Sequence, residues 1–105
     1  MIEGSRYEDI IASIAGVAAY KINGVASLSS VPGRKSRRRA PKSVQVSFSK
    51  DDRVSIDIYV NAFSGVSVPD LSYDIQQIVK KEVENATNFK ISSVNIFITG
   101  IVFNQ

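Results

Sequence analysis

The sequence predicts an α+β domain in which two helices cover one face of a mixed β-sheet. Three observations lead to this prediction: the apolar residues are mostly isoleucine and valine, two segments repeat them at helical spacing, and three segments carry the apolar residues of strands. β-Branched side chains pack well on a pleated sheet, whereas leucine occurs only at Leu28 and Leu71. The 105 residues fit one domain, residues 1–105. The predicted order is helix, strand, strand, helix, strand, in a sheet of three or four strands.

A first helix is expected from about Tyr7 to Ile22. Ser5 and Glu8 form a capping-box pattern at its start, and Gly24 is a residue type that commonly ends a helix. Its apolar stripe consists of Tyr7, Ile11, Ile14, Ala18 and Ile22, widened by Ile10 and Val17. The following residues have no periodicity, so we expect a surface loop from 25 to 43, with a flexible basic part at about 29–43.

The middle of the chain predicts a β-hairpin. Apolar and polar residues alternate over 44–48 and again over 54–63, and the polar residues 50–53 lie between the two runs. This alternation places Val54, Ile56 and Ile58 toward the helices, and Tyr59 and Phe63 on the opposite face.

A second helix is expected from about Pro69 to Thr87, because proline suits a first helical turn and apolar residues recur from Leu71 onward. Asn88 is expected to close this helix in the left-handed conformation. The last strand is expected to begin at Val94, and Gly100 to mark a bulge within it.

Composition excludes most catalytic classes. The chain has no cysteine and no histidine, so it lacks a thiolate nucleophile, a thiolate or imidazole metal site, and an imidazole base. The acid pairs Asp51–Asp52 and Asp70–Asp74 lie in a predicted turn and at a predicted helix start, where acids are favoured for structural reasons. We therefore predict no enzyme, no cofactor, no metal and no small-molecule substrate. The N-terminus has no signal-peptide pattern, and a cytoplasmic protein is expected.

The basic segment is the one compositional anomaly. The net charge is +3, yet six positive charges lie between 34 and 42 without an acid, which leaves the rest of the chain at −3. They are Arg34, Lys35, Arg37, Arg38, Arg39 and Lys42. Solvated arginines are one interpretation of this segment. The functional alternatives are contacts with nucleic-acid phosphates, anionic lipid headgroups or an acidic protein surface.

Aromatic residues on the helix-free face form a second candidate site. Tyr59, Phe63 and Phe97 are expected there, and exposed apolar patches commonly mark partner surfaces. The alternative is that a loop or the C-terminus folds over them. If they remain exposed, we expect self-association through this face or through a sheet edge.

The order of several short motifs is characteristic. Along the chain these are IASIA at 11–15, INGVASL at 22–28, GRK at 33–35, VSIDIYV at 54–60, VPDL at 68–71, IVKKEV at 78–83 and VNIFI at 94–98. Together they resemble the alkaline shock protein family, or envelope stress response family, of Gram-positive bacteria and mollicutes. The resemblance covers about residues 8–103. Arg37, Arg38 and Arg39 depart from the family pattern, as do Asn88, where glycine is common, and Phe97, where histidine is frequent.

The resemblance implies a small non-enzymatic cytoplasmic protein that self-associates and is held at the inner face of the membrane by a membrane-anchored partner. Some branches of the family are thought to act near fatty-acid biosynthesis, and no catalytic residue is carried over. An alternative from another class is a small RNA-binding domain that uses the basic segment 34–42. The GXXG clamp of KH domains is missing from the sequence.

Overall fold

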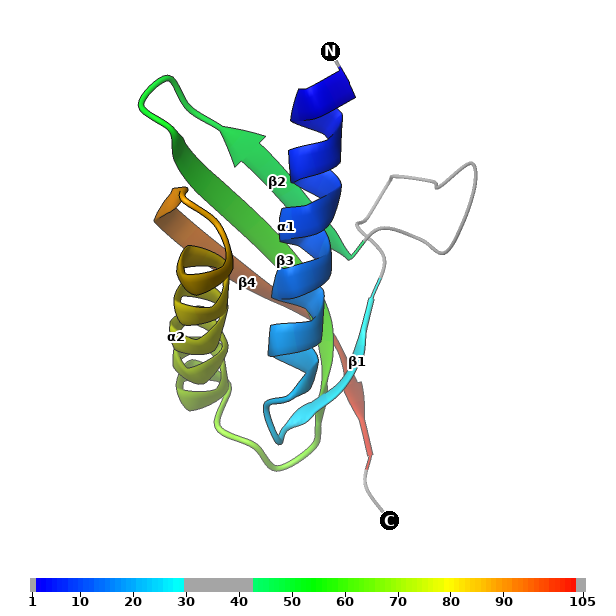
Figure 1. Ribbon diagram of the computed structural model, residues 1–105. Coiled ribbons are helices and arrows are strands. Elements are labelled where there is room, and N and C mark those ends of the chain that lie inside the picture. The colour runs from blue at the N-terminus through cyan, green and yellow to red at the C-terminus, as the bar shows by residue number, and fades with distance from the viewer. Residues whose placement is uncertain (1, 30–42, 104–105) are drawn as a thin grey trace.

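The computed structural model describes the backbone of residues 2–29 and 43–103 and the side chains from Tyr7 onward within those ranges. Its elements are α1 (Ile2–Tyr20), β1 (Val25–Leu28), β2 (Val44–Phe48), β3 (Arg53–Phe63), α2 (Val68–Ala86) and β4 (Lys90–Val102). The two helices lie side by side on one face of the sheet (Figure 1). This arrangement confirms the predicted α+β class.

β3 is the central strand of a mixed four-stranded sheet. β4 pairs with it in parallel along its whole length. On the other side two antiparallel strands share β3 end to end, since β2 pairs with Val54–Ile58 and β1 pairs with Val60–Ala62. β3 therefore pairs with strands from both halves of the chain, β1 and β2 before it and β4 after it.

The predicted loop over 25–43 is wrong at its start, because Val25–Leu28 forms β1. The strand has only four residues, and a bulge at Ala26 shifts its register between Val25 and Ser27. A bulge breaks the two-residue alternation by which a strand is recognised in a sequence. This explains why the segment showed no periodicity.

The core lies between the sheet and the helices. Val54, Ile56, Ile58, Val60 and Ala62 alternate along β3 and are all completely buried, as the hairpin pattern predicted. From the helices, the buried hydrophobic residues are Ile11, Ala15, Ala18 and Ala19 of α1 and Leu71, Ile75, Val79 and Val83 of α2. The small residues let α1 approach the sheet closely.

The structure corrects three details of the first helix. It begins at Ile2, so Ser5 lies within it and does not cap it, and it ends at Tyr20 rather than Ile22. Ile10 and Val17 do not widen the buried stripe, because 42% and 61% of these side chains remain exposed. Alanines occupy the sheet-facing side instead, which turns these larger residues outward.

The second half of the chain follows the prediction more closely. α2 begins after Ser67, whose hydroxyl accepts a hydrogen bond from the Asp70 N–H at 3.4 Å. Thr87, in an extended conformation, closes the helix through its N–H and hydroxyl, which both donate to Val83 O. The expectation for Asn88 is therefore wrong.

β4 begins at Lys90, four residues before the predicted start at Val94. Two bulges divide it, one at Ser92 and one at Thr99. The first interrupts the alternation of the early strand and hides it from a periodicity search. The second adjoins Gly100 and confirms the bulge predicted at this point.

Candidate interaction surface

The side of the sheet away from the helices, here called the open face, is built by alternate residues of β3 and β4. Ser55, Asp57, Tyr59, Asn61 and Phe63 point away from the core because their neighbours point into it. The parallel register places a residue of β4 beside each of them, in the order Ser93, Asn95, Phe97, Gly100 and Val102.

Hydrogen bonds between side chains fix the polar part of the open face. Three join residues of neighbouring strands: Ser55 and Ser93 hydroxyls at 2.8 Å, Asn95 Nδ2 to Asp57 Oδ1 at 2.9 Å, and Asn61 Nδ2 to Ser27 Oγ at 3.0 Å. A fourth joins the Ser29 and Thr99 hydroxyls at 2.6 Å, from the two sides of β3. These contacts restrict the side chains of this part of the face to one arrangement.

The aromatic residues of the open face form two separate apolar areas. Tyr59 and Phe97 stack with ring centroids 4.7 Å apart and planes 16° from parallel, and Phe97 is 41% exposed. Phe63 lies beside Val102 at the end of the sheet, beyond Asn61 and Gly100. The structure thus brings Tyr59 and Phe97 into direct contact and places Phe63 apart from them on the same face.

The six basic candidates, Arg34, Lys35, Arg37, Arg38, Arg39 and Lys42, fall within 30–42, outside the described residues. The residues on either side of 30–42 are hydrogen-bonded to one residue of β3. Ser29 N–H donates to Tyr59 O at 2.8 Å, and Tyr59 N–H donates to Ser43 O at 2.9 Å. The residues on both sides of 30–42 are therefore bonded to Tyr59, a member of the stacked aromatic pair. Sequence reasoning missed this link, because it depends on β1 and β2 sharing one strand.

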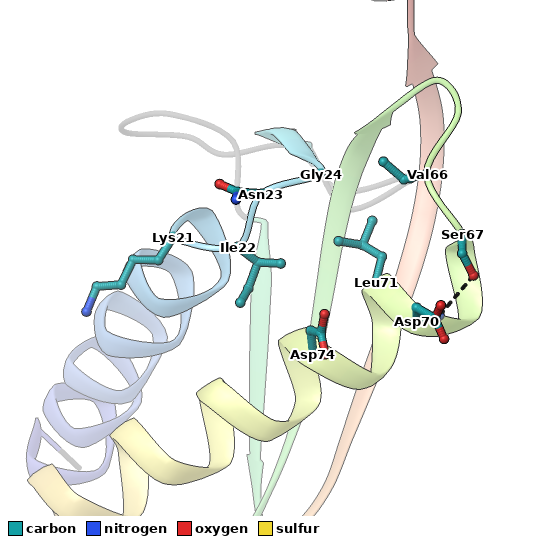
Figure 2. A pocket seen from close by; sticks show the side chains of 9 residues that line it. All are labelled: Lys21, Ile22, Asn23, Gly24, Val66, Ser67, Asp70, Leu71 and Asp74. Carbon is teal, nitrogen blue, oxygen red and sulfur yellow. Dashed lines mark hydrogen bonds between the residues drawn. The ribbon is translucent and has the colours of Figure 1, made fainter.

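A cleft of about 460 Å³ lies between the end of α1 and the start of α2 (Figure 2). Asp70 and Asp74 line it, but Lys21 points away and pairs with Glu82 at 3.8 Å. The two acids lie in the first two turns of α2, where the positive end of the helix dipole stabilises negative charge. Within residues 2–29 and 43–103 there is no group of three acids, cysteines or histidines that could hold a metal.

The outer side of α1 forms another apolar area, with Ile10, Val17 and Tyr20 exposed on it. This area is not continuous with the open face, because the sheet and core lie between them (Figure 1). In the part of the chain that the structure describes, neither helix is long and apolar enough to cross a membrane.

The model of the alkaline shock protein 23 family, described as having a cell envelope-related function, matches residues 5–103. The chain belongs to this family. Among its relatives, the uncharacterized protein YqhY of Bacillus subtilis (strain 168) is 33% identical over 101 residues, covering 91% of this chain and 74% of YqhY. The uncharacterized protein Spy1535 of Streptococcus pyogenes serotype M6 is 37% identical over 95 residues, covering 89% of this chain and 74% of Spy1535.

Solved structures with a similar fold include variants of the MamM CTD. One in a manganese form has a TM-score of 0.54 with 12% identity, covering 88% of this chain and 96% of the other. Another in a nickel form gives the same TM-score, identity and coverage. At this level of identity the similarity concerns the fold alone.

Proposed function

We propose that this member of the family is a non-catalytic interaction or scaffold protein of the cell envelope, which binds a protein partner through its open face and associates with further copies of itself. The stacked Tyr59–Phe97 pair, exposed among hydrogen-bonded polar side chains, is the observation that carries this proposal. Aromatic residues are enriched in protein interfaces, and rigid rings lose little conformational entropy on binding.

The proposed partner is a small membrane-anchored protein that holds this one at the inner face of the membrane. The family's cell envelope-related function and the resemblance of the sequence support this proposal. The basic segment 34–42 supports it as well, since its flanking residues are bonded to Tyr59. The six positive charges of this segment can contact anionic lipid or an acidic part of the partner.

The open face favours a protein over RNA as the occupant. From Ser55 to Phe63 on β3 and from Ser93 to Val102 on β4, the only charged side chain is Asp57. Single-stranded RNA needs cations for its phosphates, and the described residues of the open face supply none. A role in RNA binding would therefore rest on the basic segment alone.

Affinity capture from native cells tests the proposal with a matched pair of variants. Wild type and Val17→Asp, which changes the outer side of α1, should both retain a membrane-anchored protein, and Phe63→Asp should lose it. Phe97→Ser is a milder second variant of the open face, and circular dichroism checks that each variant folds. Recovery of ribosomes or RNA in place of a membrane protein would contradict the proposal, as would unchanged capture by both open-face variants.

A further inference from the structure

β4 is an edge strand with little protection against pairing. Among the described residues it bonds to β3 on one side, and no strand lies on its other side. Natural proteins protect long edges with charged side chains, proline or a covering element. β4 has 13 residues, contains no proline and carries one charge, Lys90, at its first position. Its outer edge is thus suited to pair with another strand.

The hydrogen bonds show which backbone groups point outward. Tyr59 directs its N–H and C=O toward β2 and β1, so the intervening residues Ile56, Ile58 and Val60 direct theirs toward β4. In a parallel ladder these bond to Ser93, Asn95 and Phe97, which leaves the N–H and C=O of Val94, Ile96 and Ile98 on the outer edge.

Side chains of α2 cover the first part of this edge. Gln76 Nε2 donates to Val94 O at 2.9 Å, and Glu84 Oε2 accepts from Ile91 N–H at 2.9 Å. After the bulge at Thr99 the even-numbered residues of β4 direct their backbone groups toward β3 instead of outward. Val102 O, for example, accepts a hydrogen bond from the N–H of Ser64, the residue after β3. Between the covered part and the bulge, the backbone groups of Ile96 and Ile98 remain directed outward.

We infer that two copies of this chain pair β4 with β4 in antiparallel fashion around a two-fold axis at Phe97. In this register Ile96 lies opposite Ile98 of the second copy, and each such pair exchanges two backbone hydrogen bonds. A register centred on Ile96 would oppose Ile98 with Val94, whose carbonyl is already bonded to Gln76. A register centred on Ile98 would oppose Ile96 with Gly100, which lies beyond the bulge. In the register centred on Phe97 both obstacles fall in the outer Val94–Gly100 pairs, so the two Ile96–Ile98 pairs form their backbone hydrogen bonds without them.

This register also continues the aromatic stack. Phe97 faces Phe97 of the second copy at a non-hydrogen-bonded position, where side chains of antiparallel strands come closest. The Tyr59–Phe97 pair of each copy then joins into a row of four rings on one continuous open face. The inference rests on the self-association proposed above and assigns the surface responsible for it.

Cysteine cross-linking tests the register, because the natural chain contains no cysteine. Opposed residues at a non-hydrogen-bonded position have Cα atoms about 4.5 Å apart, which lies within the range of a disulfide. Under mild oxidation Phe97→Cys should form a covalent dimer at least about ten times faster than Tyr59→Cys or Asn95→Cys, which are displaced from the axis. Equal or faster cross-linking of either control would overturn the register.

Amide hydrogen exchange tests the backbone contacts in the unmodified protein. Raising the protein concentration should slow exchange at Ile96 and Ile98 but not at Asn95 and Phe97, whose N–H groups are bonded to β3 in the monomer. Sedimentation distinguishes the proposed self-association from the proposed β4 interface. A dimer that lacks this alternating protection from exchange would overturn the β4 interface but not self-association. A strict monomer at millimolar concentration would overturn both.

Discussion

Gly24 turns the chain from α1 into β1 with a φ of +109°, a conformation that L-residues with a side chain rarely adopt. A Cβ atom at this position would lie 3.0 Å from Leu71 Cδ1. We expect Gly24→Ala to lower the free energy of unfolding by about 2–3 kcal/mol, through backbone strain and the displacement of Leu71. Urea unfolding measures this loss.

Gly65→Ala is the matched control, because Gly65 also has a positive φ, +89°, but nothing lies within 4 Å of its Cβ position. This variant should lose only the conformational part, about 1 kcal/mol. Equal losses for the two alanine variants would show that the contact with Leu71 has no effect.

Single-residue signals located turns better than helix ends. Gly24 was predicted to end the first helix, yet α1 ends at Tyr20, and the positive φ of Gly24 serves the turn into β1 instead. Ser5 and Asn88 were also plausible caps, yet Ser5 lies inside α1 and Thr87 closes α2. Serine and asparagine suit several positions near a helix end, so tertiary packing decides which residue becomes the cap.

Adjacent isoleucines of α1 allow a direct test of the corrected helix face. Ile11 is completely buried against the sheet, whereas Ile10 points outward. We expect Ile11→Ala to lower the free energy of unfolding by about 2–5 kcal/mol, because it removes buried methyl groups and leaves a cavity. Ile10→Ala should change it by less than about 0.5 kcal/mol. Denaturant titration of both variants measures the difference. Comparable losses of unfolding free energy would show that Ile10 also belongs to the core.

The elements with unbroken periodicity were those predicted best. β3 alternates over its entire length, and α2 repeats its buried residues every three or four positions, so both were placed to within about one residue. β1 and the start of β4 were missed because bulges at Ala26 and Ser92 break the alternation. The buried face of α1 was misjudged, because alanine gives a weak signal beside exposed isoleucine and valine.

For the whole molecule, charge is separated between a basic segment and an acidic remainder, with a net charge of +3 in total. If the segment contacts a polyanion, affinity should fall steeply with salt. Six contacts with single-stranded RNA would give a log–log slope of about −0.7 each, roughly −4 in all. Replacing Arg37, Arg38 and Arg39 by serine should halve the slope without changing stability, as fluorescence titration at several salt concentrations would show. A slope near zero in the wild type would exclude this mode of binding.

The sequence predicted which aromatic residues lie on the open face, but not how they contact one another. Strand alternation correctly assigned Tyr59, Phe63 and Phe97 to the open face. The stacking of Tyr59 on Phe97 follows from the parallel register of β3 and β4, which are separated along the chain by α2. The outward groups of β4 depend on two bulges and on two α2 side chains, and neither could be inferred from periodicity.

The sharing of one side of β3 by β1 and β2 makes the connection between them tolerant of changes in length. Ser29 and Ser43 bond to opposite ends of the same residue, Tyr59, so each strand takes its register from β3 and not from the other strand. The free energy of loop closure rises by only about 0.6 kcal/mol for each doubling of loop length. Insertions and deletions between these two serines should therefore cost little free energy and leave the register of both strands on β3 unchanged.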